Sequence, residues 1–145
     1  MQTLAEPTRG EASDDVLLIE DDVAIADMYA LGLNLSGYRV RVAGSSDAAL
    51  AQVAEGARPR LIVLDLGLPR TGGLDVLVAL REGPTTSTVP VIVLSNQDDD
   101  FPEAYRRGAT GCLTKHRTTP KELVSYIKVA MDATNWGSDG ANAVA

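Results

Sequence analysis

The chain is poor in cysteine, in long apolar runs and in positive charge, and each shortage excludes a class of protein. Its 145 residues include one cysteine, Cys112, so no disulfide can form within the chain, which fits a reducing compartment. No apolar run exceeds five residues, far below the ~20 needed to cross a bilayer. Thirteen Lys and Arg stand against twenty Asp and Glu, and the net charge of −7 disfavours binding to nucleic-acid phosphates. We therefore expect a cytoplasmic protein without membrane insertion or nucleic-acid binding.

What is present is the composition of one folded domain. Hydrophobic residues make up 45% and charged residues 23% of the chain, a mix typical of globular proteins with a core. Both ends are rich in small and polar residues and offer too little apolar surface to offset the entropy of ordering. The N-terminal segment also lacks the apolar stretch of a secretory signal. We expect flexible tails at 1–14 and 136–145, one domain at 15–135, and no attached output domain.

Five short segments have the character of β-strands. Three are fully apolar and rich in β-branched residues, which is typical of strands buried on both faces of a parallel sheet; they are Val16–Ile19, Leu61–Leu64 and Val91–Leu94. Two are weaker, Tyr38–Val42 and Gly111–Thr114. Because the weaker segments alternate with polar residues or are short, we expect them at the sheet edges.

Segments with helical spacing separate these strands. The first carries an apolar stripe, with Asp22 as its N-cap and Gly37 as its stop; the stripe consists of Ala24, Met28, Leu31 and Leu35. Further helices are expected after Ser46 around Leu50 and Val53, around Leu74 and Leu77, at Pro102–Arg107, and from Thr119-Pro120 onward.

This alternation predicts an α/β fold, a three-layer, doubly wound (βα)5 domain with a five-stranded parallel sheet. Crossovers between parallel strands are right-handed, so the helices cover both faces of the sheet. With the second and fifth strands at the edges, the order becomes 2-1-3-4-5, the flavodoxin-like order. Ligands of such sheets bind at the carboxyl ends of the strands, beside the switch point between strands one and three.

Charged and polar side chains follow the strands at that edge. The carboxylates of Glu20, Asp21 and Asp65 end the first and third strands, and they would repel one another unless a cation neutralised them. Mg²⁺ prefers such oxygen ligands. Ser95 and Lys115, at the ends of strands four and five, suit phosphoryl oxygens as a hydroxyl donor and a point charge. An aspartate carboxylate can itself attack phosphorus, so the sequence predicts a magnesium site beside an acceptor aspartate.

Four segments at these strand ends resemble the receiver domain of two-component response regulators, of the chemotaxis-regulator type. They are VLLIEDD, LIVLDLGLPRTGGLDVL, VPVIVLSNQ and GATGCLTK, and the resemblance runs from about Val16 to Asn135. It implies a role for each matching position: Asp65 as phosphoacceptor, Asp21 as direct Mg²⁺ ligand, Glu20 as a ligand through metal-bound water, the backbone carbonyl of Gly67 as a further ligand, Ser95 as the hydroxyl that swings toward the phosphoryl group, and Lys115 as its salt-bridge partner.

The resemblance also implies a function. We expect a stand-alone response regulator of a two-component or phosphorelay system, phosphorylated by a histidine kinase or phosphotransfer protein. Its aspartyl phosphate would be lost by self-catalysed hydrolysis, with no turnover of an external substrate. Signalling would pass through a separate downstream protein, and homodimerisation stays open.

The sequence departs from the family at three positions. Cys112 stands where the family usually has an aromatic residue, His116 where it has proline, and Asn96 where it has a small residue. These departures motivate an alternative, a receiver-fold binding module that signals without phosphorylation. Two other classes fit less well. A haloacid-dehalogenase-like phosphohydrolase needs a second aspartate where Gly67 stands, and a flavin carrier needs a phosphate-binding loop where the acids after strand one would repel phosphate.

Overall fold

The sheet has the predicted order and direction. In this computed structural model, which describes residues 14–69 and 72–144 (backbone only in 134–144), five parallel strands are ordered β2-β1-β3-β4-β5. Their bounds are β1 Val16–Ile19, β2 Val40–Ala43, β3 Leu61–Asp65, β4 Val91–Ser95 and β5 Gly111–Thr114. The predicted fold class and the three central strands are therefore confirmed, and β3 and β4 each include the polar residue that ends them.

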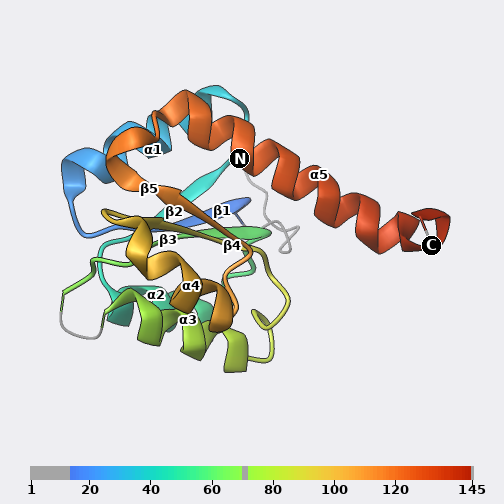
Figure 1. Ribbon diagram of the computed structural model, residues 1–145, viewed down its shortest axis with the longest axis horizontal. Helices are drawn as coiled ribbons and strands as arrows, with labels where there is room; N and C mark the ends of the chain where they lie inside the picture. The colour runs from blue at the N-terminus through green and yellow to red at the C-terminus, as the bar shows by residue number, and fades with distance from the viewer. Residues whose placement is uncertain (1–13, 70–71, 145) are drawn as a thin grey trace, which may run out of the picture.

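Helices cover both faces of this sheet, as Figure 1 shows. In the described part of the chain they are α1 Val23–Leu35, α2 Ser46–Ala54, α3 Gly73–Glu82, α4 Phe101–Arg106 and α5 Pro120–Val144, with short 3-10 turns η2 Asp98–Asp100 and η3 Lys115–Arg117. Helices α1 and α5 lie on one face, and α2, α3 and α4 lie on the other (Figure 1). The predicted three-layer arrangement is confirmed.

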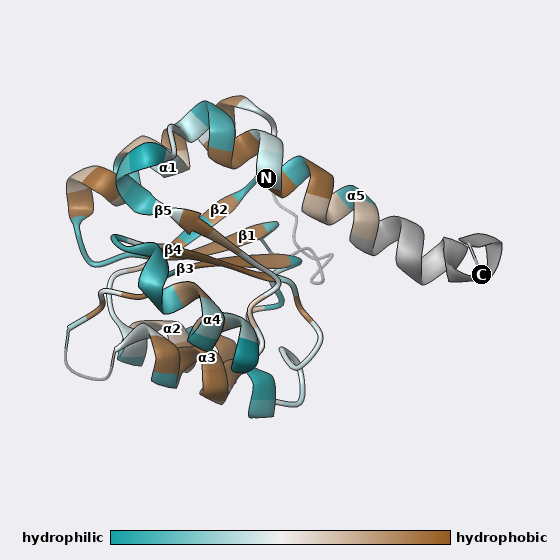
Figure 2. Ribbon diagram, in the orientation of Figure 1, coloured by the Kyte–Doolittle hydropathy of each residue, from teal (hydrophilic) through white to brown (hydrophobic). Residues whose placement is uncertain are grey.

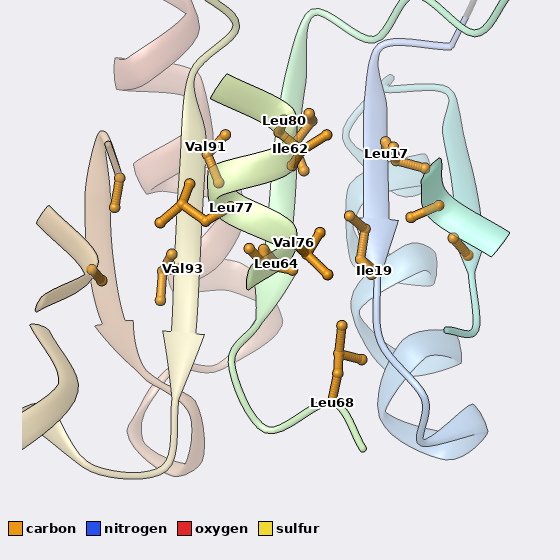
Figure 3. Packing of buried hydrophobic residues seen from close by; sticks show 14 of the residues in the cluster. Leu17, Ile19, Ile62, Leu64, Leu68, Val76, Leu77, Leu80, Val91 and Val93 are labelled. Carbon is orange, nitrogen blue, oxygen red and sulfur yellow. The ribbon is translucent and has the colours of Figure 1, made fainter. Parts of the chain in front are cut away.

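The two faces of the sheet explain why its central strands are apolar up to the residue that ends them. Successive side chains of a strand point to opposite faces, so Leu17 and Ile19 pack in the cluster with α3, while Val16 and Leu18 pack in the cluster with α1 and α5. Figure 3 shows Leu77 of α3 among the side chains of the neighbouring strands. The strands are accordingly hydrophobic along most of their length (Figure 2).

The side of helix α1 that packs on the sheet is not the apolar stripe identified from the sequence. Its buried residues are Ala26, Tyr29 and Leu33, whereas Leu31 and Leu35 of the predicted stripe are 59% and 79% exposed. The helix has one charged residue among thirteen, Asp27, so apolar residues lie on most of its circumference. Spacing alone identifies such a helix but does not say which stripe is buried.

One strand boundary differs from the prediction, and the predicted domain bounds stay predictions. The second strand begins at Val40, two residues after the predicted start, because Tyr38 closes the turn that follows α1 through its backbone N–H to Leu33. Helix α5 continues to Val144, past the predicted domain end at 135. The N-terminal tail falls at residues outside the described part, apart from Asp14, so the tail assignments stay predictions. No helix in the described ranges is both long and apolar enough to span a membrane.

Candidate functional site

Three carboxylates meet at the carboxyl edge of β1 and β3. The two strands are paired with Ile19 opposite Leu64, so the residues that follow, Glu20 and Asp65, lie side by side. Asp21 is the next residue along the chain. One carboxylate oxygen from each of the three lies within 4.8 Å of the others. Glu20 and Asp65 are 1% and 2% exposed, while Asp21 faces solvent.

Lys115 brings a positive charge into this cluster. It follows β5 directly, and its Nζ lies 2.9 Å from Oε1 of Glu20 and 3.1 Å from Oδ2 of Asp65. The ammonium donates to Oδ2 of Asp65 and to Oε2 of Glu20, both at 3.1 Å. A single cation therefore bridges the two buried carboxylates, which come from different strands.

Burial and pairing set the protonation of this bridge. Burial raises the pKa of Glu20, an effect that the hydrogen bond from Lys115 only partly offsets. For Lys115, burial acts to lower the pKa, but the hydrogen bonds to Glu20 and Asp65 together outweigh it and the pKa is raised. The lysine is thus held as a cation by the acids it contacts.

Gly67 completes the surroundings of Asp65. Its backbone N–H donates to Oδ1 of Asp65 at 2.8 Å, so each oxygen of this carboxylate has one donor. A Cβ at position 67 would lie 3.3 Å from the same oxygen, which is tighter than ordinary contact and favours glycine there. These residues line a hollow of about 580 Å³ that opens between α1 and the segment after β5.

The donor set suits a divalent cation with a preference for oxygen. Three ionised carboxylates and one ammonium leave the cluster with two negative charges, which one such cation would balance. Among the described residues, the buried Oε1 of Glu20 accepts no well-aligned hydrogen bond, and it forms the ion pair with Lys115 Nζ at 2.9 Å. A carboxylate oxygen paired with one ammonium keeps a lone pair for a metal ion. This acidic triad is typical of the Mg²⁺ site of receiver domains.

Ser95 does not join this group. It is 2% exposed, and its hydroxyl lies 2.8 Å from both Oδ2 of Asp100 and the carbonyl of Gln97, as a donor. The backbone N–H of Gln97 donates to the same hydroxyl at 3.2 Å. The side chain is not part of the lining of the hollow, whereas its neighbour Asn96 is. Of the six residues predicted for the site, Ser95 alone is engaged elsewhere among the described residues.

Sequence reasoning missed the tyrosine that fixes the segment after β5. The buried Tyr29 of α1 donates its hydroxyl to the carbonyl of Thr118 at 2.7 Å and also contacts that of Lys115 at 3.3 Å. Both carbonyls belong to the turn that carries Lys115 and His116. The available signal was the spacing of Ala26, Tyr29 and Leu33, which places a hydroxyl on the buried side of α1.

The sequence profile of the response regulator receiver domain family matches residues 16–128. Among curated proteins, the chain is 30% identical over 128 residues to the phosphate regulon transcriptional regulatory protein PhoB of Pseudomonas aeruginosa, covering 87% of this chain and 55% of that protein. It is 38% identical over 124 residues to the DNA-binding dual master transcriptional regulator RpaA of Synechocystis, covering 83% and 50%. The chain thus spans about half the length of these relatives.

Comparison with solved structures agrees with this family assignment. The chemotaxis protein CheY4 of Vibrio cholerae superimposes with a TM-score of 0.74 at 28% identity, over 81% of this chain and 98% of that one. The receiver domain of NtrX from Brucella abortus gives a TM-score of 0.73 at 30% identity, also over 81% and 98%. Both matches cover nearly all of the solved chain, so the similarity extends over the whole fold.

Proposed function

The chain belongs to the response regulator receiver domain family, whose members are signalling modules and not turnover enzymes, and we propose that its Asp65 accepts a phosphoryl group in the presence of Mg²⁺. Receiver domains take this group from histidine kinases, and a phosphotransfer protein is the other donor that we propose. The observation that carries the proposal is the meeting of Glu20, Asp21 and Asp65 with Lys115 bridging two of them.

The proposed roles follow from the contacts. Glu20, Asp21, Asp65 and the carbonyl of Gly67 would hold Mg²⁺, which supplies positive charge against the oxygens of the incoming phosphoryl group. An oxygen of Asp65 forms the new bond to phosphorus, while the bond from phosphorus to the donor nitrogen or oxygen breaks and that atom keeps the electron pair. Lys115, already 3.1 Å from Asp65, is placed to pair with a phosphoryl oxygen.

The same proposal includes how the signal leaves the domain. Adding a phosphoryl group of about −2 charge to an edge of the sheet changes what the neighbouring surface binds, and we propose that a separate protein reads this change. We place the protein in the cytoplasm, where its kinase partner acts. The relatives' own names, which include DNA-binding regulators, describe those longer proteins.

Mass spectrometry with a small-molecule phosphodonor tests the proposal. Incubation with Mg²⁺ and acetyl phosphate should add one phosphoryl group to the parent protein and none to Asp65→Asn. The matched control is Asp47→Asn, an exposed acid in the first turn of α2, which should be modified like the parent. If neither acetyl phosphate nor a cognate kinase modifies the parent, the alternative of a receiver-fold module that signals without phosphorylation takes its place.

A further inference from the structure

We propose that Asp100 is a positioning residue that holds the Ser95 hydroxyl away from Asp65. Its carboxylate would compete with a phosphoryl group on Asp65 for the hydrogen bond that the Ser95 hydroxyl donates. The inference rests on the proposed function, because it concerns the same site. In that function the Ser95 hydroxyl donates to a phosphoryl oxygen on Asp65. In the structure the hydroxyl is already engaged by a negatively charged acceptor.

The contacts leave Ser95 no free proton to donate toward the site. A serine hydroxyl has one proton to donate, and both acceptors within reach, Oδ2 of Asp100 and the carbonyl of Gln97, lie at 2.8 Å. The hydroxyl oxygen in turn accepts from the Gln97 N–H at 3.2 Å. Since Ser95 is 2% exposed, water cannot readily replace these partners. Donation toward Asp65 therefore requires that the hydroxyl leaves both acceptors, of which Asp100 is the charged one.

Asp100 is directed to Ser95 and away from the role that its position would ordinarily give it. It is the N-cap residue of α4, where an aspartate usually accepts from a backbone N–H of the first turn. No such bond exists here, and the side chain instead accepts from Ser95. Its neighbours Asp98 and Asp99 are exposed, and the carboxylate that is hydrogen-bonded to Ser95 is that of Asp100. They carry the same charge and serve as matched controls.

The competition has a defined consequence. A hydrogen bond to a carboxylate is stronger than one between neutral groups, so the form in which Ser95 faces Asp65 is disfavoured while Asp100 is present. Removing the carboxylate should ease the change. Because the Gln97 carbonyl remains as a neutral acceptor, the expected effect is the difference between a charged and a neutral hydrogen bond, a roughly three- to tenfold change in an equilibrium constant. Asp100 would thus set how readily the phosphorylated state recruits Ser95.

The first measurement needs neither metal nor phosphoryl group. In metal-free protein, the backbone amide NMR signals of Ser95 and Gln97 should move in Asp100→Ala, because the hydroxyl that accepts from Gln97 N–H loses one of its two acceptors and keeps only the Gln97 carbonyl of the pair. The same signals should stay in place in Asp99→Ala. Unmoved Ser95 and Gln97 signals in Asp100→Ala would overturn the proposal, and so would equal movement in both variants.

The second measurement tests the competition itself. Titration of Mg²⁺-loaded protein with beryllium fluoride, a mimic of a carboxyl-bound phosphoryl group, should give a midpoint roughly three- to tenfold lower in Asp100→Ala than in the parent. Asp100→Asn keeps the shape without the charge and should fall between them, and Asp99→Ala should match the parent. In a Ser95→Ala background the Asp100 substitution should have no further effect, because its action passes through Ser95.

The possible results distinguish a failure of the role of Asp100 from a failure of the proposed function. Equal midpoints for parent and Asp100→Ala would overturn the role of Asp100 and leave the proposed function standing. A shift that persists in Ser95→Ala would also overturn it, because charge alone would then explain the effect. A parent protein that binds no beryllium fluoride would contradict the proposed function, and the role of Asp100 would fall with it.

Discussion

The single thiol of the chain illustrates how burial controls one residue's chemistry. Cys112 lies on β5 and is 8% exposed. Burial raises the pKa of its thiol from 9.0 to about 11, although a hydrogen bond with Tyr105 acts in the other direction. Because only the thiolate is a nucleophile, a structural thiol of this kind is expected to be inert at neutral pH. The residue that replaces the family's usual aromatic is thus a small packing residue.

Labelling kinetics test this reading of Cys112. At pH 8 a thiol reagent should modify the native protein at least about a hundredfold more slowly than the denatured protein, since two pKa units lower the thiolate fraction by that factor. The sign for stability follows. The unfolded thiol ionises near 9 and the folded thiol near 11, so this group leaves stability unchanged below pH 9 and lowers it as pH rises through that window. Equal labelling rates would contradict the assignment.

At the level of single residues, the sequence predicts where the charged groups gather better than it predicts which way the Ser95 hydroxyl points. Glu20, Asp65 and Lys115 follow directly after strands, so the parallel order alone brings them to one edge. Ser95 also ends a strand, but the direction of its hydroxyl depends on the short turn after it. That turn presents the Asp100 carboxylate and the Gln97 carbonyl at 2.8 Å, a local geometry that no spacing rule in the sequence specifies.

At the scale of elements, α1 is joined to the turn after β5 by one side chain. The Tyr29 hydroxyl donates to the Thr118 carbonyl and contacts that of Lys115. Tyr29→Phe removes this donor and leaves a part-buried carbonyl without its partner. We expect a loss of about 1–3 kcal/mol in the free energy of unfolding, measured by denaturant titration, together with slower phosphorylation because Lys115 is less firmly positioned.

A second tyrosine provides the control for this prediction. Tyr126 of α5 lies at 36% exposure, and in the described part of the chain its hydroxyl makes no hydrogen bond with the turn after β5. Tyr126→Phe should therefore leave the phosphorylation rate near that of the parent. If Tyr29→Phe matches the parent in both the free energy of unfolding and the phosphorylation rate, the hydrogen bond from Tyr29 to the turn after β5 does not contribute to either.

Elements also show where sequence patterns reach their limit. The bounds of the edge strand Gly111–Thr114 and of the short helix around Pro102 are predicted to within a residue. The residues that flank these two elements in the sequence define where each begins and ends. The buried side of α1 is mispredicted, because Met28, Leu31 and Leu35 are as apolar as the residues that pack on the sheet. Only the position of the sheet and of α5 decides which of two apolar stripes is covered.

For the whole molecule, the unbalanced acids of the site couple cation binding to stability. The net charge is −7, and the three carboxylates within 4.8 Å of one another add to that repulsion in the folded state. Unfolding separates them. A cation that binds only the folded site must therefore stabilise the protein, by about 2.7 kcal/mol when its concentration is 100 times its dissociation constant.

Thermal unfolding with and without Mg²⁺ separates repulsion from ligation. The parent should unfold at a temperature several degrees higher in saturating Mg²⁺, at roughly 2–4 °C per kcal/mol. Asp21 is exposed and, among the described residues, forms no ion pair, so Asp21→Asn should raise the metal-free unfolding temperature slightly and abolish the gain from Mg²⁺. Asp47→Asn, away from the cluster, should keep the full gain. A gain of the same size in Asp21→Asn and the parent would mean that Mg²⁺ acts through general screening of a −7 protein, and not at the acidic edge of β1 and β3.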